Sequence, residues 1–356
     1  MPRPTTLSVD LDALSQNAAA TRSLAGNSKI LASVKANAYG HGIVRCSEVL
    51  SHSVDGFAVA FCEEAVELRQ HNIALPLLVL EGAFDRTDIE AIREHNLMMT
   101  LHSHYQIDLL EKAGYVPTTP LWIKVDTGMH RLGFSPEEAP KVIHRLRQLG
   151  ADSTILMSHY ADGENPSSAV TIKQQQAWQT LTGSTSSESS VANSAAILNG
   201  LATATDWVRP GIMLYGAQHT DEGTAKPLTP VMSFNSVVMA LRQVPVGETV
   251  GYGGRWRATR ESLIATIPVG YGDGYPRGAE DGTPVWIHNG RFPLVGRVSM
   301  DMITVDVTDF PNCQIGTSVE LWGKNLPVNE VARHAGTIGY ELLTRLTGRV
   351  PMSFSD

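Results

Sequence analysis

Charged and polar side chains stand at the ends of several short apolar runs in the first two thirds of the sequence. Taken alone, each has an ordinary structural explanation, since a lysine at a strand end commonly extends its ammonium into solvent. Together they favour one shared polar site, because the carboxyl ends of barrel strands meet on one face. The residues are Lys35, Lys124, Asp126, Arg131, His159, Asn193, Ser194, Arg209 and Gly211.

Lys35 follows the apolar run 30–34 and precedes Gly40 and Gly42, whose freedom would let backbone N–H groups approach a ligand. Burial disfavours an ammonium, and pKa shifts of roughly 3–5 units from about 10.4 are known for buried lysines. An uncharged amine can condense with an aldehyde. A predicted helix start at Ser194 and the segment 209–212 (RPGI) offer N–H groups to a phosphate. This combination predicts pyridoxal phosphate as cofactor.

The elements that position these residues alternate between apolar runs and helical patterns. Because the runs are apolar on both faces, they predict parallel strands and a (β/α)8 TIM-type barrel. A doubly wound open sheet is the alternative, and the absence of a GxGxxG motif after any strand counts against it. The expected strands are 30–35, 56–60, 77–80, 98–101, 121–126, 153–158, 189–193 and 206–214, and the expected helices 62–71, 86–95, 103–113, 136–149 and 168–182.

From about residue 228 the pattern changes to strand-like runs broken by Gly, Pro and Asn. Such runs predict a mostly antiparallel β domain, with short helices near 328–335 and 338–346. We therefore expect a barrel domain over 1–225 and a C-terminal domain over 226–356. The segment 221–230 is the predicted linker, and residues 1–10 are candidates for pairing with the C-terminal domain.

Composition excludes several classes of function. The 356 residues carry a net charge of −8 with no basic stripe, which argues against nucleic acid and anionic membranes as partners. No run approaches the roughly 20 apolar residues of a membrane span, and no apolar signal segment opens the chain, so a cytoplasmic location is expected. The three scattered cysteines predict neither a disulfide frame nor a metal site.

A series of longer motifs resembles one family, the alanine racemases, which are bacterial pyridoxal-phosphate enzymes built from a barrel and a β domain. The resemblance covers nearly the whole chain, and several long motifs in the same order are far more specific than one short motif. The motifs are SVKANAYGHG, IKVDTGMHRLGF, SHYADG, NSAA, WVRPGIMLYG, VGYGG, VGYGDGYPR, GRVSMDM and TIGYELL.

The resemblance implies roles for individual residues around the cofactor. Lys35 carries the cofactor through a Schiff base and serves as one catalytic base. Tyr252 is the opposing base and reaches the site of the second subunit of a homodimer. Arg209 faces the pyridine nitrogen, and His159 lies between Arg209 and the Tyr252 side. The phosphate is held by Tyr39, Ser194, Gly211, Ile212 and Tyr340.

The remaining implied roles concern the substrate. Arg131 supports the cofactor's phenolic oxygen and the substrate carboxylate, and Met300 offers its backbone N–H to substrate across the dimer. Tyr271 and Asp301 border the path by which substrate enters. Lys124 matches a lysine that is carbamylated in some members of the family. The resemblance thus implies racemisation of L- and D-alanine, either to supply D-alanine for peptidoglycan or to break it down.

Arg209 and other features distinguish an alanine racemase from three alternative functions. A guanidinium only donates hydrogen bonds, so it leaves the ring nitrogen unprotonated, and we hypothesise that this suppresses transamination. A related decarboxylase would place an acidic residue there. A non-catalytic carrier of the cofactor would not need the C-terminal half with Tyr252. A broad-specificity exported racemase is disfavoured by the missing signal and the unpaired cysteines.

Overall fold

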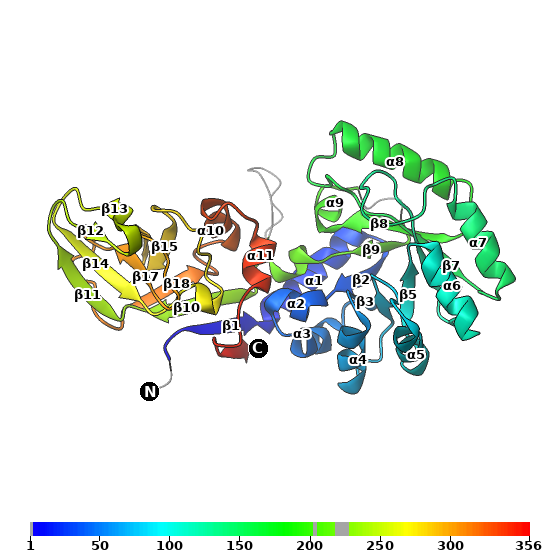
Figure 1. Ribbon diagram of the computed structural model, residues 1–356, viewed down its shortest axis with the longest axis horizontal. Helices are drawn as coiled ribbons and strands as arrows, with labels where there is room; N and C mark the ends of the chain where they lie inside the picture. The colour runs from blue at the N-terminus through cyan, green and yellow to red at the C-terminus, as the bar shows by residue number, and fades with distance from the viewer. Residues whose placement is uncertain (1–2, 202–204, 218–227) are drawn as a thin grey trace.

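Eight short parallel strands close into a barrel in the first part of the chain (Figure 1). The computed structural model describes residues 3–201, 205–217 and 228–356. The strands follow one another around the barrel in sequence order, and the last pairs with the first. The predicted barrel is therefore confirmed. Its strands are β2 (Lys29–Ser33), β3 (Gly56–Val59), β4 (Leu77–Val79), β5 (Met98–Leu101), β6 (Leu121–Lys124), β7 (Thr154–Met157), β8 (Glu188–Asn193) and β9 (Trp207–Arg209).

Helices surround the barrel and bury one apolar stripe each against it. In α7, for example, Val142, Ile143 and Leu146 are buried, at the spacing of one helix face. The Ser168 side chain accepts a hydrogen bond from the Thr171 N–H and so caps the start of α8. The helices are α1 (Leu11–Ala25), α3 (Ile43–Leu50), α4 (Cys62–Gln70), α5 (Arg86–Glu94), α6 (His104–Ala113), α7 (Ala139–Gln148), α8 (Ala169–Thr182) and α9 (Ser194–Leu198).

The barrel interior is a packed core, so the polar residues are confined to one end of it. Trp122 and Trp207 meet edge to face with their ring centroids 5.6 Å apart. Such a filled interior is typical of barrels of this size. The inward-facing core consists of Leu31, Ala58, Leu78, Met98, Trp122, Ile155, Met157 and Trp207.

Most predicted strands run beyond the observed ones, usually by one or two residues, and two of these differences matter for the site. The expected strand 206–214 was wrong beyond Arg209: β9 stops there and a 3-10 turn, η1 (Ile212–Tyr215), follows. Pro210 lacks the N–H that would continue the ladder. The expected strand 30–35 was also too long, since β2 ends at Ser33 and leaves Lys35 in the segment beyond it.

The C-terminal part is a mostly antiparallel β domain, as predicted. Its largest sheet has the strand order β16-β15-β18-β10-β1-β19, beside the sheets β11-β14-β17 and β12-β13. Two helices, α10 (Val328–His334) and α11 (Gly339–Thr344), accompany them. The strands are β10 (Met232–Val237), β11 (Ala240–Val244), β12 (Thr249–Val250), β13 (Trp256–Arg257), β14 (Ser262–Ile267), β15 (Pro284–Ile287), β16 (Gly290–Pro293), β17 (Ile303–Asp306), β18 (Ser318–Trp322) and β19 (Met352–Ser355).

The first strand of the chain belongs to this C-terminal sheet. Strand β1 (Thr6–Asp10) pairs antiparallel with β10 and parallel with β19 before the chain continues into α1 of the barrel. The proposed boundary at 225/226 and most of the proposed linker 221–230 lie outside the described residues.

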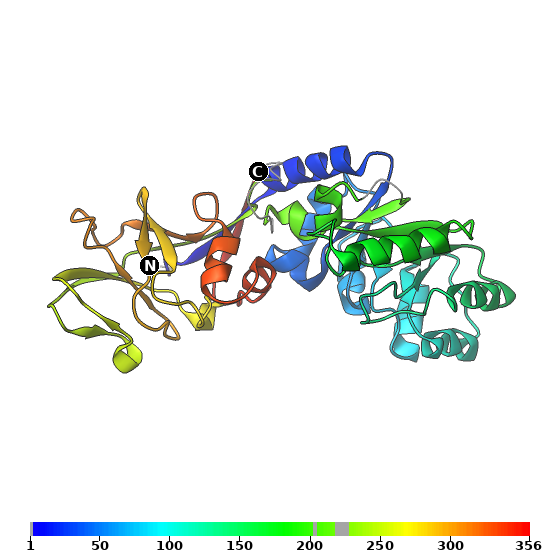
Figure 2. The same cartoon turned by 90° about the horizontal axis from the view of Figure 1, so that it is seen from above.

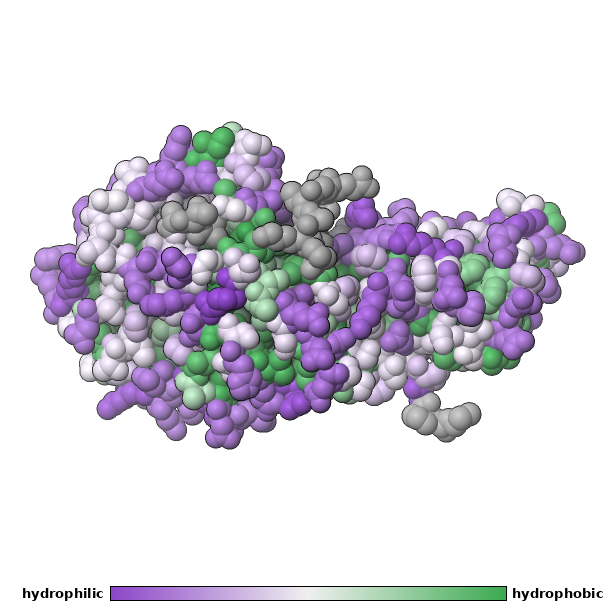
Figure 3. Space-filling view, turned by 180° about the vertical axis from the view of Figure 1, so that it is seen from behind, coloured by the Kyte–Doolittle hydropathy of each residue, from purple (hydrophilic) through white to green (hydrophobic). Residues whose placement is uncertain are grey.

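The two parts lie side by side and give the molecule an elongated shape (Figures 1 and 2). Helix α11 lies where they meet, next to the barrel segment after β2. From behind, the surface is largely hydrophilic with scattered hydrophobic residues (Figure 3). Within the described ranges, no helix is long and apolar enough to cross a membrane.

Candidate active site

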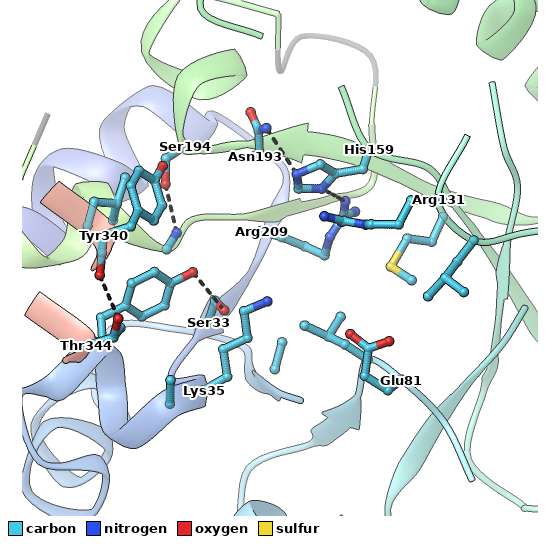
Figure 4. Close-up of a pocket in the computed structure, with 18 of the residues that line it drawn as sticks. Ser33, Lys35, Glu81, Arg131, His159, Asn193, Ser194, Arg209, Tyr340 and Thr344 are labelled. Atoms are coloured by element: carbon cyan, nitrogen blue, oxygen red, sulfur yellow. Dashed lines mark hydrogen bonds between the residues drawn. The ribbon is translucent and has the colours of Figure 1, made fainter. Parts of the chain in front are cut away.

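A cavity of about 500 Å³ opens at the carboxyl ends of the barrel strands. In Figure 4 the Lys35 side chain lies between two groups of polar residues, with Arg209, His159 and Arg131 on one side and Ser194 and Tyr340 on the other. The described residues that line the cavity are Ser33, Lys35, Ala36, Tyr39, Ala58, Leu80, Glu81, His102, Lys124, Arg131, Leu132, Met157, His159, Asn193, Ser194, Arg209, Gly211, Ile212, Tyr340, Glu341 and Thr344.

The backbone after Lys35 forms a left-handed turn. Residues 36–39 all have φ between 51° and 56°, a conformation that is unfavourable for residues with a Cβ. One tertiary and two local contacts hold it: the Ala36 N–H donates to Glu64 Oε1 at 2.6 Å, and His41 Nδ1 lies 3.0 Å and 2.9 Å from the Ala38 and Tyr39 carbonyls. The turn directs Lys35 and Tyr39 toward the same cavity.

The two glycines after this turn do not serve the expected purpose. Neither Gly40 nor Gly42 lines the cavity. A Cβ on Gly40 would lie 2.1 Å from the Leu343 carbonyl oxygen, and one on Gly42 would lie 2.8 Å from the Phe354 ring. The expectation that they bring N–H groups to a ligand was therefore wrong: they let the turn pack closely against the C-terminal part of the chain.

Two lysines in the cavity have lowered pKa values. Burial lowers the pKa of Lys35, the Glu81 carboxylate opposes this shift, and the positive Arg131 adds to it. Burial lowers the pKa of Lys124 to about 7, with further contributions from Arg209 and Arg131. Each amine therefore reaches its uncharged, nucleophilic form more easily than a solvated lysine.

Arg209 and His159 form a buried pair at the wall of the cavity. Arg209 donates to Ser190 Oγ and to the Ser158 carbonyl, and its Nη2 lies 3.3 Å from His159 Nδ1. Burial lowers the pKa of Arg209 to about 10, so the guanidinium is still charged at neutral pH.

His159 is held in its neutral form by this arrangement. Burial and the charge of Arg209 put the pKa of its imidazole well below the usual range. The side-chain Nδ2 of Asn193 lies 3.3 Å from the other ring nitrogen, Nε2. The side-chain Oδ1 of Asn193 caps α9 by accepting a hydrogen bond from the Ala196 N–H. Donors thus face both ring nitrogens, and such donors do not stabilise a protonated imidazole.

Hydroxyl and backbone N–H groups gather on the opposite side of the cavity. Ser194 Oγ accepts hydrogen bonds from the N–H groups of Gly211 at 2.8 Å and Met213 at 3.4 Å. A Cβ on Gly211 would lie 2.4 Å from the Tyr39 hydroxyl, so only glycine allows this close approach. Burial raises the pKa values of Tyr39 and Tyr340, which keeps their hydroxyls protonated and able to donate.

Arg131 reaches the cavity from the loop that follows β6. This loop is closed at its base, where the Phe134 N–H donates to the Lys124 carbonyl at 2.9 Å. Inside it, Asp126 Oδ1 accepts from the N–H groups of three successive residues, 128, 129 and 130. These bonds lower the pKa of Asp126 against the effect of its burial, and they fix the loop ahead of Arg131.

Four of the five predicted residues of the C-terminal domain do not line the cavity of their own chain, and Tyr340 is the exception. Tyr252 and Met300 are 73% and 52% exposed. Asp301 is exposed and accepts a hydrogen bond from Arg349 at 2.7 Å, and Tyr271 is half-buried. By contrast, Asp126 is the single predicted residue of the barrel that does not line the cavity, because its carboxylate holds the loop after β6. The predicted residues that line it are Lys35, Tyr39, Lys124, Arg131, His159, Asn193, Ser194, Arg209, Gly211, Ile212 and, from α11, Tyr340.

Sequence reasoning missed three titratable residues of the cavity wall, Glu81, His102 and, in α11, Glu341. The first two follow strands of the barrel. They stand just beyond the ends of β4 and β5, and the Glu81 carbonyl lies 3.2 Å from His102 Nε2. The rule that pointed to Lys35 and His159, a polar residue directly after a buried strand, would have identified both.

Comparisons with known proteins agree along nearly the whole chain. Family models described as alanine racemase, N-terminal domain, and alanine racemase, C-terminal domain, match residues 9–219 and 231–354. An alanine racemase from Pseudoalteromonas atlantica is 44% identical over 99% of both chains, and a catabolic alanine racemase from Pseudomonas putida is 42% identical over 99% of both. The structure of a biosynthetic alanine racemase from Pseudomonas aeruginosa superposes with a TM-score of 0.95 at 42% identity, covering 99% of this chain and 100% of that one. The chain belongs to the alanine racemase family.

Proposed function

We propose that this protein interconverts L- and D-alanine with pyridoxal phosphate bound in the barrel cavity. The observation that carries the proposal is the position of the Lys35 amine, whose pKa is lowered. It lies between a cationic wall, formed by Arg209 and Arg131 beside His159, and the hydroxyl groups of Ser194 and Tyr340 (Figure 4). The similarity to proteins named alanine racemase over the full chain supports the choice of substrate.

The residues of the cavity fit this cofactor. The hydroxyls of Ser194, Tyr39 and Tyr340, beside a glycine whose Cβ would fill the space, suit a phosphate group. Lys35 would hold the aldehyde carbon, and Arg209 would donate a hydrogen bond to the ring nitrogen. When bound, pyridoxal phosphate supplies an electron sink that acidifies the substrate's α-proton.

Arg209 would limit how far that sink operates. Its guanidinium is fixed by Ser190 and the Ser158 carbonyl and can donate a hydrogen bond but cannot protonate a ring nitrogen. The neutral His159 beside it cannot do so readily either, since its pKa is well below the usual range. This wall would therefore favour prompt return of the proton to the α-carbon over side reactions such as transamination.

Racemisation removes the α-proton from one face and returns a proton on the other, and two bases on opposite faces do this directly. Lys35 would take or return the proton on one face, and the partner subunit's Tyr252 would act on the other in a homodimer. The exposure of Tyr252 on its own chain suits a residue that functions in a second chain. Arg131 and the backbone N–H of the partner's Met300 would bind the substrate, beside a path bordered by Tyr271 and Asp301. Tyr340 narrows the cavity, which favours the small side chain of alanine, with serine next.

Lys124 would carry a carbamate. Its uncharged amine attacks the carbon of CO₂, a C–N bond forms and one proton is released, leaving a negative carboxylate on the side chain. A pKa of about 7 makes the uncharged amine abundant at neutral pH. The nearby positive charges of Arg131 and Arg209 would stabilise the product, and the carbamate would steady Arg131.

The proposal concerns the reaction, and it holds whether the protein makes D-alanine or breaks it down. Relatives named biosynthetic and catabolic are equally similar to this chain, at 42% identity. This is expected, because a racemase accelerates the reaction both ways.

Borohydride reduction combined with a chiral assay tests the proposed function. The purified protein should be yellow, borohydride should attach a pyridoxyl group to the peptide that contains Lys35, and L-alanine should convert to a racemic mixture. Attachment at another lysine, or a yellow protein that leaves L-alanine unchanged, would overturn the proposal.

A further inference from the structure

A glutamine outside the cavity joins two loops that carry cavity residues. Gln174 lies in α8 and is only 1% exposed. It shares one helix face with the buried Thr171, Trp178 and Leu181, where an apolar side chain is expected. It does not line the cavity, and none of the roles described above uses it.

Both the nitrogen and the oxygen of the Gln174 side-chain amide form hydrogen bonds. Its Nε2 donates to the His159 carbonyl at 3.0 Å and to Thr127 Oγ1 at 3.3 Å, and its Oε1 accepts from the Ala161 N–H at 2.8 Å. Only a side chain with a donor and an acceptor at this length makes all three bonds. A carboxylate would keep the acceptor and lose both donations, and an apolar side chain would leave the buried His159 carbonyl and Ala161 N–H without this partner.

One set of Gln174 contacts, which we call the first arm, reaches the loop that carries Arg131. Thr127 directly follows Asp126, which begins the hydrogen-bonded turn of that loop, and the Thr127 hydroxyl lies 2.7 Å from Ser158 Oγ. The Gln174 stem also packs beside the loop, since a Cβ on Gly128 would lie 3.3 Å from Gln174 Cγ. The loop is thus held by a hydrogen bond and by packing.

The other arm leads to the Arg209 and His159 pair. The His159 carbonyl and the Ala161 N–H fix the backbone on both sides of residue 160, and the imidazole of His159 lies against Arg209. Ser158, which Thr127 contacts, accepts from Arg209 through its carbonyl. The two arms therefore meet at the same cationic wall.

We propose that Gln174 is a positioning residue, which locks the loop after β6 to the loop after β7 and thereby sets Arg131 and His159 in register at the cavity. This inference rests on the proposed function for its catalytic consequence. A displacement of about 1 Å at a reacting centre can cost on the order of 100-fold in rate, so a remote residue with this role has a large kinetic effect.

The test compares two glutamines of one helix. Gln174→Met removes the three bonds at similar volume, and Gln176→Met is the matched control, because Gln176 is exposed. We expect kcat/KM for L-alanine to fall on the order of 10- to 100-fold in Gln174→Met, and by less than about 2-fold in Gln176→Met. Hydrogen exchange should accelerate at 126–134 and 158–163 in Gln174→Met and stay unchanged in β4 and α5.

Thr127→Val separates the two arms. It removes the hydrogen bonds of the Thr127 hydroxyl to Gln174 and to Ser158 Oγ, and it leaves the His159 carbonyl paired with Gln174. KM should therefore rise more than kcat falls. Combined with Gln174→Met it should add little, because both changes disrupt one network.

Two results would overturn the inference. One is a folded Gln174→Met protein with the kcat/KM and pH profile of Gln176→Met, whatever its Tm. The other is exchange that accelerates evenly through the barrel with no excess in the two loops. If the wild-type protein does not racemise alanine, the proposed function fails, and the exchange pattern still decides whether Gln174 holds the two loops.

Discussion

The barrel mouth and the C-terminal domain present their chemically active residues in opposite ways. At the barrel mouth, burial has shifted the pKa values of Lys35, Lys124 and His159, and hydrogen bonds fix the side chains around them. On the C-terminal domain, Tyr252 and Met300 are exposed. Burial and hydrogen bonds within one chain thus organise the barrel half of the site. The C-terminal half would acquire its environment only against a second chain.

The largest expected effects come from removing the proposed base of the barrel, Lys35, or that of the C-terminal domain, Tyr252. Lys35→Ala should lower kcat by roughly 10⁴-fold and abolish the yellow colour, whereas Tyr252→Phe should lower kcat by about 10²–10⁴-fold and keep the colour. Absorbance spectra and a chiral assay of both variants check this. A colourless Tyr252→Phe protein would show that Tyr252 is needed to bind the cofactor. That result would contradict the assignment of cofactor binding to the barrel.

Arg209→Glu should have the next largest effect, because it reverses the charge of the buried wall. We expect racemisation to fall by about 10²–10³-fold, with transamination rising relative to racemisation. Pyruvate formation measured beside chiral turnover gives the ratio. An unchanged ratio would contradict the role given to Arg209.

Lys124 predicts a pH dependence of stability. The folded protein loses the Lys124 proton near pH 7, whereas an unfolded chain keeps it to about pH 10.4. Between these values the unfolded state binds more protons, so this residue makes stability rise with pH. In CO₂-free buffer, Lys124→Met should raise Tm at pH 7 and flatten its increase toward pH 9. A steeper increase in the variant would refute the lowered pKa.

The smallest effect is expected at Met300. Its side chain is exposed and its proposed contribution is a backbone N–H, so Met300→Leu should change kcat/KM by less than about 3-fold. Steady-state kinetics on L-alanine is the measurement. A loss of 100-fold or more would show that the side chain itself acts in the site.

The barrel could be predicted because its strands are buried on both faces and read as uninterrupted apolar runs. The ends of these runs located Lys35, His159 and Arg209, and the same rule would have found Glu81 and His102. It failed at 206–214, where the apolar pattern continues through Pro210 although the ladder cannot.

Other features depend on tertiary contacts that no local pattern encodes. The left-handed turn at 36–39 includes two alanines, which rarely adopt this backbone, and its start is held by Glu64 of α4. Gln174 looks like one of three similar glutamines, and only the folded helix shows which one is buried. The insertion of β1 between β10 and β19 joins segments from both ends of the chain.

Mixed dimers test the central claim most directly, that each site combines Lys35 of one chain with Tyr252 of another. Lys35→Ala and Tyr252→Phe proteins, each inactive alone, would be mixed and allowed to exchange subunits. Every mixed dimer would then hold one native site and one doubly altered site, so activity should recover to roughly a quarter of wild type. No recovery after exchange is verified by mass would contradict a site shared between chains.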